Sequence, residues 1–96
     1  MIYIKIHKTK ENGLIAVCDE NLIGKKFEEG DLCLNVSNKF YKGELMDESS
    51  AEKILIEANN INFVGENAVN LGLKLGLILK EHILVIKGVK HAQSCK

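Results

Sequence analysis

The fold is decided by two apolar stretches near the start of the chain, Ile2-Tyr3-Ile4-Lys5-Ile6-His7 and Leu14-Ile15-Ala16-Val17. In the first stretch isoleucine occupies every second position, which is the pattern of a strand with one apolar face. The second stretch is apolar throughout, which is typical of a strand that is buried on both faces. Between them, Asn12-Gly13 favours a tight turn because both residues tolerate positive φ. We therefore predict a hairpin whose second strand is central in a sheet.

The next segment predicts one more strand. Leu32, Leu34 and Val36 alternate with polar residues and indicate a third strand. Before it, Gly24 and Gly30 bracket a charged stretch that we expect to be a loop, and residues 40–43 after it are expected to form a connecting turn.

Two helices and a last strand are predicted in the second half of the chain. The S-x-x-E pattern of Ser49–Glu52 predicts a capping box and a helix over residues 50–59. Asn62 is a candidate cap for a second helix over residues 63–75, apolar on two sides. The apolar run Ile83–Ile86 predicts a buried last strand, and the tail Gly88–Gln93 is expected to be a loop.

These elements follow one another in the order β-β-β-α-α-β. A strand that returns after two helices must cross over and pair with the earlier sheet. We therefore predict an α+β fold, a small mixed β-sheet with two helices packed on one face. The chain has no proline and no low-complexity linker, so we expect residues 1–96 to form a single compact domain.

The charge of the chain is balanced. Thirteen lysines face thirteen acidic residues, and there is no arginine. No net field therefore draws the protein to nucleic acid or to an anionic membrane, and arginine's bidentate recognition of phosphate is absent. The lysines are concentrated in residues 1–10 and 71–96, so a basic surface would require these two segments to lie on one side of the fold.

The three cysteines are Cys18, Cys33 and Cys95, with no CxxC pair. An odd count without a secretory signal predicts free thiols in a reduced, cytoplasmic protein, and the apolar runs are too short to cross a membrane. Structural zinc usually shows closely spaced ligand pairs, which this chain lacks. We expect no metal and no cofactor.

Polar residues gather at two predicted strand ends. Cys18 and Asp19 directly follow the central apolar strand, and His91 and Gln93 follow the predicted last strand. We expect the His91 imidazole to lie beside the Cys18-Asp19 turn. The full set of candidate binding residues is Cys18, Asp19, Lys25, Tyr41, Glu66, His91 and Gln93.

Four segments resemble the archaeal domain-of-unknown-function 424 family. They are Ala16–Lys25, Phe40–Glu44, Asn62–Glu66 and the closing Gly88-Val89-Lys90-His91-Ala92-Gln93. The chain departs from the family at Lys90, where proline is expected, and this substitution leaves the tail less rigid. The resemblance implies an archaeal cytoplasmic protein with a link to translation or RNA, and it implies no particular activity. The positions that match are Cys18, Asp19, Gly24, Lys25, Phe40, Tyr41, Gly43, Gly65, Glu66, His91 and Gln93.

Three hypotheses for function follow. The first is a small non-catalytic binding module for RNA or a ribonucleoprotein, because tyrosine and histidine can stack on bases and glutamine can bind base edges. The second is an enzyme in which Cys18 is the nucleophile and His91 its base. The third is a homodimer that forms through the doubly apolar second helix.

Overall fold

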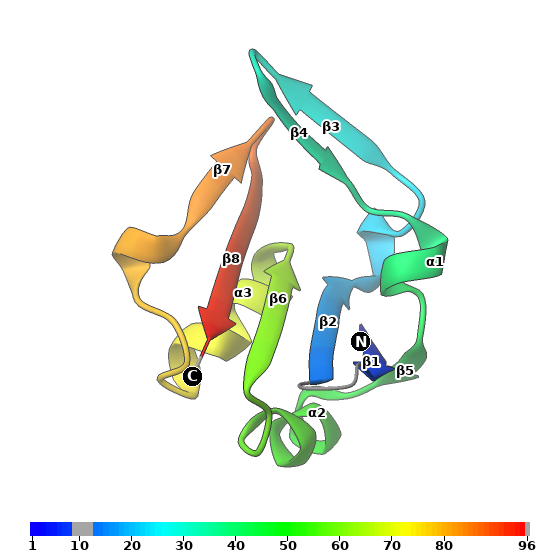
Figure 1. Ribbon diagram of the computed structural model, residues 1–96, viewed down its shortest axis with the longest axis vertical. Helices are drawn as coiled ribbons and strands as arrows, with labels where there is room; N and C mark the ends of the chain where they lie inside the picture. Colours follow the sequence, from blue (N-terminus) through cyan, green and yellow to red (C-terminus); the bar gives the residue numbers. More distant parts are fainter. Residues whose placement is uncertain (9–12, 96) are drawn as a thin grey trace.

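The computed structural model describes residues 1–8 and 13–95. Six strands form one twisted sheet in the spatial order β5-β1-β2-β6-β8-β7 (Figure 1). β2 and β6 are parallel and every other neighbouring pair is antiparallel, so the sheet is mixed. The strands are β1 (Ile2–Lys8), β2 (Gly13–Asp19), β5 (Glu44–Met46), β6 (Asn60–Val64), β7 (Leu84–Ile86) and β8 (Val89–Cys95).

The first two strands confirm the predicted hairpin. β1 and β2 are antiparallel from Ile2–Asp19 to Lys8–Gly13, and the turn residue Asn12 lies outside the described residues. β2 is central, between β1 and β6, and its residues from Ile15 to Asp19 are buried. The continuous apolar run therefore produces a strand covered on both faces, as predicted.

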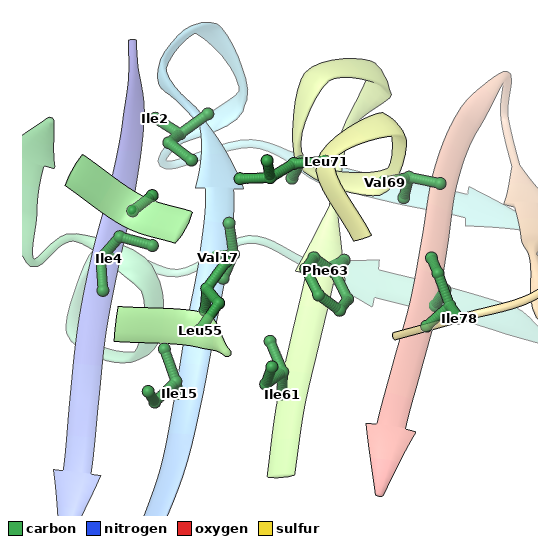
Figure 2. Packing of buried hydrophobic residues seen from close by; sticks show 13 residues of the cluster. Ile2, Ile4, Ile15, Val17, Leu55, Ile61, Phe63, Val69, Leu71 and Ile78 are labelled. Atoms are coloured by element: carbon green, nitrogen blue, oxygen red, sulfur yellow. The ribbon is translucent and has the colours of Figure 1, made fainter. Parts of the chain in front are cut away.

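Two helices cover one face of the sheet, which we call the helix face. α2 (Glu48–Leu55) contributes Ala51 and Leu55, and α3 (Glu66–Lys74) contributes three further buried residues to the same core. Figure 2 shows this core, in which Leu55 of α2 and Leu71 of α3 lie against strand residues such as Val17 and Phe63. The predicted α+β class, the mixed sheet and the two helices on one face are thus confirmed.

A second layer covers part of the opposite face, which we call the hairpin face. Strands β3 (Lys26–Glu29) and β4 (Leu32–Asn35) form a separate two-stranded sheet, followed by the short helix α1 (Asn38–Tyr41). Leu34, Val36 and Tyr41 pack there on Ala16 and Val64 of the main sheet. The hairpin tip also contacts the β7–β8 turn, where the backbone N–H of Lys87 donates to the Glu29 carboxylate at 2.7 Å. Two short 3-10 turns, η1 (Glu20–Leu22) and η2 (Lys80–His82), complete the described chain.

This second layer corrects three sequence predictions. The charged stretch predicted as a loop contains β3, whose Phe27 pairs with Leu34 while its other residues face solvent. The third predicted strand is real, but it pairs only within this hairpin and outside the main sheet. The predicted turn at residues 40–43 is in part the helix α1, which Ser37 caps by accepting from the Phe40 N–H.

The segment predicted as the second helix begins as a strand and becomes helical only in its later part. Residues 60–64 form β6 in the middle of the sheet, and helix α3 begins only at Glu66. Asn62, predicted as a helix cap, is a strand residue paired with Gln93. The apolar positions of a five-residue strand fit a helical period as well, so tertiary pairing decides the structure here. α2 also begins differently, because Asp47 rather than Ser49 caps it.

The tail is the other correction. Residues 89–95 form β8, an inner strand between β6 and β7, whereas a loop was predicted. Lys87 and Gly88 both have positive φ (52° and 78°), which makes a two-residue turn of the kind that joins hairpin strands. The predicted last strand is the short edge strand β7, and Leu84 and Val85 are more than half exposed. The element order is therefore not β-β-β-α-α-β, because β3, β5, β6, β8 and the short helix α1 were missed.

Candidate functional site: the hairpin face of the sheet

Strand register places side chains of four strands in rows across the hairpin face. Residues of one strand alternate between the faces, and paired residues of neighbouring strands share a face. The first row is Cys18, Val64 and His91, the second is Lys5, Ala16, Asn62 and Gln93, and the third is His7, Leu14, Asn60 and Cys95. The face changes character along these rows, because the first is mainly apolar and the other two are mainly polar.

The apolar end of the hairpin face lies beneath β3, β4 and α1, and we call it the covered half. Cys18 is fully buried there, and its thiol donates to the backbone oxygen of Asp19 at 3.2 Å. Burial, with a smaller contribution from Asp19, raises the pKa of the Cys18 thiol to about 12. Burial, followed by the proximity of Cys18, likewise raises the pKa of Tyr41 to about 12. Both groups are therefore protonated at neutral pH, and the Cys18 thiolate that a nucleophile requires does not form.

Asp19 has a different task at the same end of β2. Its side chain lies on the helix face and is 4% exposed. Its two carboxylate oxygens accept from the backbone N–H groups of Asn67 and Ala68, at 3.0 and 2.8 Å. Asp19 thus caps α3 from a neighbouring strand, because the residue that precedes the helix, Gly65, has no side chain to do so.

Gly65 permits this arrangement in two ways. Its φ of 106° is unfavourable for a residue with a side chain, and a Cβ at this position would lie 2.6 Å from Asp19 Oδ2. Next to it, Glu66 on the first turn of α3 forms an ion pair with Lys90 at 3.2 Å. Asp19, Gly65, Glu66 and Lys90 therefore form one group at the start of α3, on the side of the sheet away from His91.

His91 lies at the border of the covered half. Its Nε2 is buried and has no hydrogen-bond partner among the described residues. Burial lowers the pKa of this imidazole, so His91 is neutral at physiological pH. Cys18 and His91 share the hairpin face, but they are two strands apart, about 10 Å at the usual strand spacing. The expected contact between the tail imidazole and the Cys18-Asp19 turn does not form.

The remaining end of the hairpin face is the open half, built from the second and third rows except Ala16, which is buried beneath the second layer. Gln93 is exposed and donates from Nε2 to Asn62 Oδ1 at 2.8 Å, which fixes the orientation of both amides. These amides line a hollow of about 310 Å³ together with Leu14, Asn60 and Cys95. The hollow therefore presents amide donors and acceptors beside an aliphatic side chain.

An aromatic pair borders the open half on the β1 side. The rings of His7 and Phe40 are stacked with centroids 4.5 Å apart. His7 Nε2 lies 2.8 Å from the backbone oxygen of Phe40, and it is the donor because a carbonyl oxygen only accepts. Lys5 of the second row lies on the same strand.

The seven candidate residues thus fall into separate places. Cys18 and Tyr41 are buried in the covered half, Asp19 and Glu66 are at the start of α3, and only Gln93 projects from the open half. Lys25 is exposed in the segment before β3, where its backbone pairs with Val36 and Leu22. Of the two basic segments, Lys5 lies on the hairpin face and Lys90 on the helix face, so these two lysines do not share a surface.

The candidate binding set left out the residues that dominate the open half, Lys5, His7, Asn60 and Asn62, and Phe40 was singled out only as a position that matches the family. The signal was present in part, because Lys5 and His7 occupy the polar positions of the first alternating strand. Asn60 and Asn62 could not be found while their segment was interpreted as the start of a helix.

Two further properties of the described residues bear on the kind of site. Among residues 1–8 and 13–95, no group of three or more histidine, cysteine, aspartate or glutamate side chains is placed to hold a metal ion. No helix in the same ranges is long and apolar enough to span a bilayer.

Fold and site together define an α+β protein with a polar, half-covered sheet face. The chain belongs to the DUF424 family of proteins of unknown function, whose model matches residues 7–96. The predicted family resemblance is therefore confirmed. A crystal structure of an uncharacterized conserved protein from Methanopyrus kandleri is similar over 99% of this chain and 93% of that one, with 27% identity and a TM-score of 0.80. No curated protein matches the chain.

Proposed function

We propose that this protein is a small non-catalytic binding module that takes single-stranded RNA on the open half of its sheet. The observation that carries the proposal is the convergence of polar side chains from β1, β6 and β8 on one open surface. Asn62 and Gln93 present amide groups of the kind that bind base edges, and the His7–Phe40 stack borders the same surface. Sheet faces are a common platform for unpaired bases.

The charge of the chain sets the expected strength of binding. The thirteen lysines are balanced by thirteen acidic residues and there is no arginine, so the protein has no excess of positive charge and no bidentate donor for phosphates. We therefore expect modest affinity that falls as salt rises. We further propose that the chain acts as one domain in the cytoplasm of an archaeal cell, in a process linked to translation. The related structure from Methanopyrus kandleri, an archaeon, and the unpaired exposed thiols of Cys33 and Cys95 support this setting.

The geometry favours this function over the two alternatives. An enzyme that uses Cys18 would need a reactive thiol beside His91, and the thiol is buried, protonated and two strands away. The apolar sides of α3 are accounted for within the chain, since Val69 and Leu71 are buried in the core. A homodimer through α3 stays a prediction that no feature of this helix requires.

The test is a titration of dye-labelled ten-residue oligouridine and oligoadenine, followed by fluorescence anisotropy at about 50 and 200 mM salt. Loss of one hydrogen bond predicts that Asn62→Ala weakens binding about fivefold. Asn70→Ala, a change of the same kind on exposed α3, is the control and is expected to bind like the unaltered protein. Absence of binding at low salt, or equal losses in the two variants, would overturn the proposal.

A further inference from the structure

A second hollow lies between β1 and α1, at the border of the open half. It has a volume of about 420 Å³ and is lined by Lys5, His7, Ser37, Lys39 and Phe40. Of the described residues that line it, two are lysines and none is acidic. This composition differs from that of the hollow at Asn62 and Gln93, which is lined by neutral residues.

The two lysines and the serine of this hollow each have a donor to offer. Ser37 Oγ accepts from the Phe40 N–H at 3.2 Å, and its own hydroxyl hydrogen remains available. The His7 Nε2–H is already held by the Phe40 oxygen at 2.8 Å, which fixes the ring as one wall of the hollow. Two lysines and one serine hydroxyl therefore line the hollow together, and no carboxylate is among its lining residues.

The position of the hollow is at the end of the polar rows. β5 pairs with β1 only from Ile2 to Ile4, so among the described residues Lys5 and His7 lie on an outer edge of the main sheet. The rows of the open half run from this edge across β2 to Asn62 and Gln93. A ligand that lies along the rows would place one of its ends, rather than its middle, at the hollow.

We infer that this hollow binds a phosphate monoester. A monoester carries close to two negative charges at neutral pH, which matches two lysines better than the single charge of an internal phosphodiester does. The Phe40 and His7 rings supply an apolar wall on which an adjoining base or sugar can pack. The assignment of this phosphate to an RNA end rests on the proposed function, whereas the recognition of a monoester does not.

The experiment compares ten-residue oligouridines that carry a 5′-phosphate, a 3′-phosphate or no terminal phosphate, each labelled away from the phosphate. One of the two phosphorylated forms is expected to bind about fivefold more tightly than the unphosphorylated form, since it adds a charge-assisted contact. Lys39→Gln is expected to abolish this preference. The control, Lys42→Gln, removes an equally exposed lysine that does not line the hollow and should preserve it.

Uridine 5′-monophosphate and inorganic phosphate, titrated separately, distinguish the sources of the monoester. The His7 imidazole resonances report binding in each titration. If the mononucleotide binds as tightly as the phosphorylated oligomer, the hollow is a nucleotide site, and the inference holds without RNA. The inference is overturned if all three oligomers bind with equal affinity and the His7 resonances do not respond to the mononucleotide. It is also overturned if the Lys39 and Lys42 variants lose the preference for the phosphorylated oligomer equally. The proposed function is judged separately, by the unphosphorylated oligomer and the Asn62 variant.

Discussion

The two halves of the hairpin face are made by the same strands and differ in what covers them. In the covered half, Cys18 and Val64 face Leu34, Val36 and the buried Tyr41. Two residues from Val64 on β6 and two residues from His91 on β8, Asn62 and Gln93 instead line an open hollow. The comparison teaches that one strand can serve two environments, because its apolar part packs under a second layer and its polar part lines an open hollow.

The largest expected effect comes from exchanging the character of the two halves on one strand. Val64→Asn would place an amide without partners in the covered half and is expected to lower the free energy of unfolding by about 3 kcal/mol. Asn62→Val, the matched change two residues earlier, should alter stability by less than about 0.5 kcal/mol. Urea denaturation measures both. Similar losses in the two variants would show that the halves are not distinct.

The next prediction compares two helix caps, the buried cap that Asp19 provides for α3 and the exposed cap that Asp47 provides for α2. Asp19→Ala leaves two backbone N–H groups of α3 without their acceptor, so we expect a loss of about 2 kcal/mol. Asp47→Ala removes the exposed cap of α2 and should cost about 1 kcal/mol. Thermal or urea unfolding of both variants gives the comparison. If the Asp47 variant is the less stable one, the buried cap is not the stronger of the two.

The covered half should also protect its thiol. We expect iodoacetamide at pH 8 to modify the exposed Cys33 and Cys95 and to leave Cys18 at least about tenfold slower, since its thiol is buried and its pKa is raised to about 12. Peptide mass spectrometry after a timed reaction measures the three rates, and the same reaction in urea provides the fully reactive reference. Modification of Cys18 at the rate of Cys33 would mean that the second layer opens readily.

The smallest expected effect is a pH dependence that comes from the border between the halves. Burial lowers the folded-state pKa of His91 below its ordinary value of about 6.5, so the unfolded chain binds a proton that the folded protein does not. Stability is therefore complete above about pH 6.5 and falls as the pH decreases below it. Urea midpoints at pH 7.5 and 5.5 should differ less for His91→Leu than for the unaltered protein. If the midpoint difference between the two pH values is the same in His91→Leu and in the unaltered protein, His91 is not the group that makes stability depend on pH.

The sequence predicted those parts of the fold in which one kind of residue dominates a strand. The alternation of residues 2–7 and the apolar run of residues 14–17 specify β1 and β2 directly. β6 and β8 were missed because each carries polar residues inside the sheet, Asn62 in one and Gln93 in the other, where the open half admits them. The turn at Lys87-Gly88 was missed because lysine is not a usual residue for positive φ.

The site was predictable only in outline. Gln93 was found because it is polar in a segment that follows an apolar run, and the choice of Asp19 followed the end of β2. The partner of Asp19, the start of α3, depends on the parallel pairing of β2 with β6, which no local pattern contains. For the same reason the sequence could not reveal that Asp19 and His91 lie on opposite faces.

That parallel pairing also has a consequence for how the protein reaches its structure. The β1–β2 and β7–β8 hairpins can form from neighbouring segments, but β6 alone joins them, and its pairing with β2 connects Ile15 to Ile61. Closing such a long loop is entropically costly and is rewarded only when the pairing is complete. We therefore expect the docking of β6 to limit the folding rate, so that Ile61→Val slows refolding in stopped-flow experiments, whereas Leu34→Ala chiefly speeds unfolding.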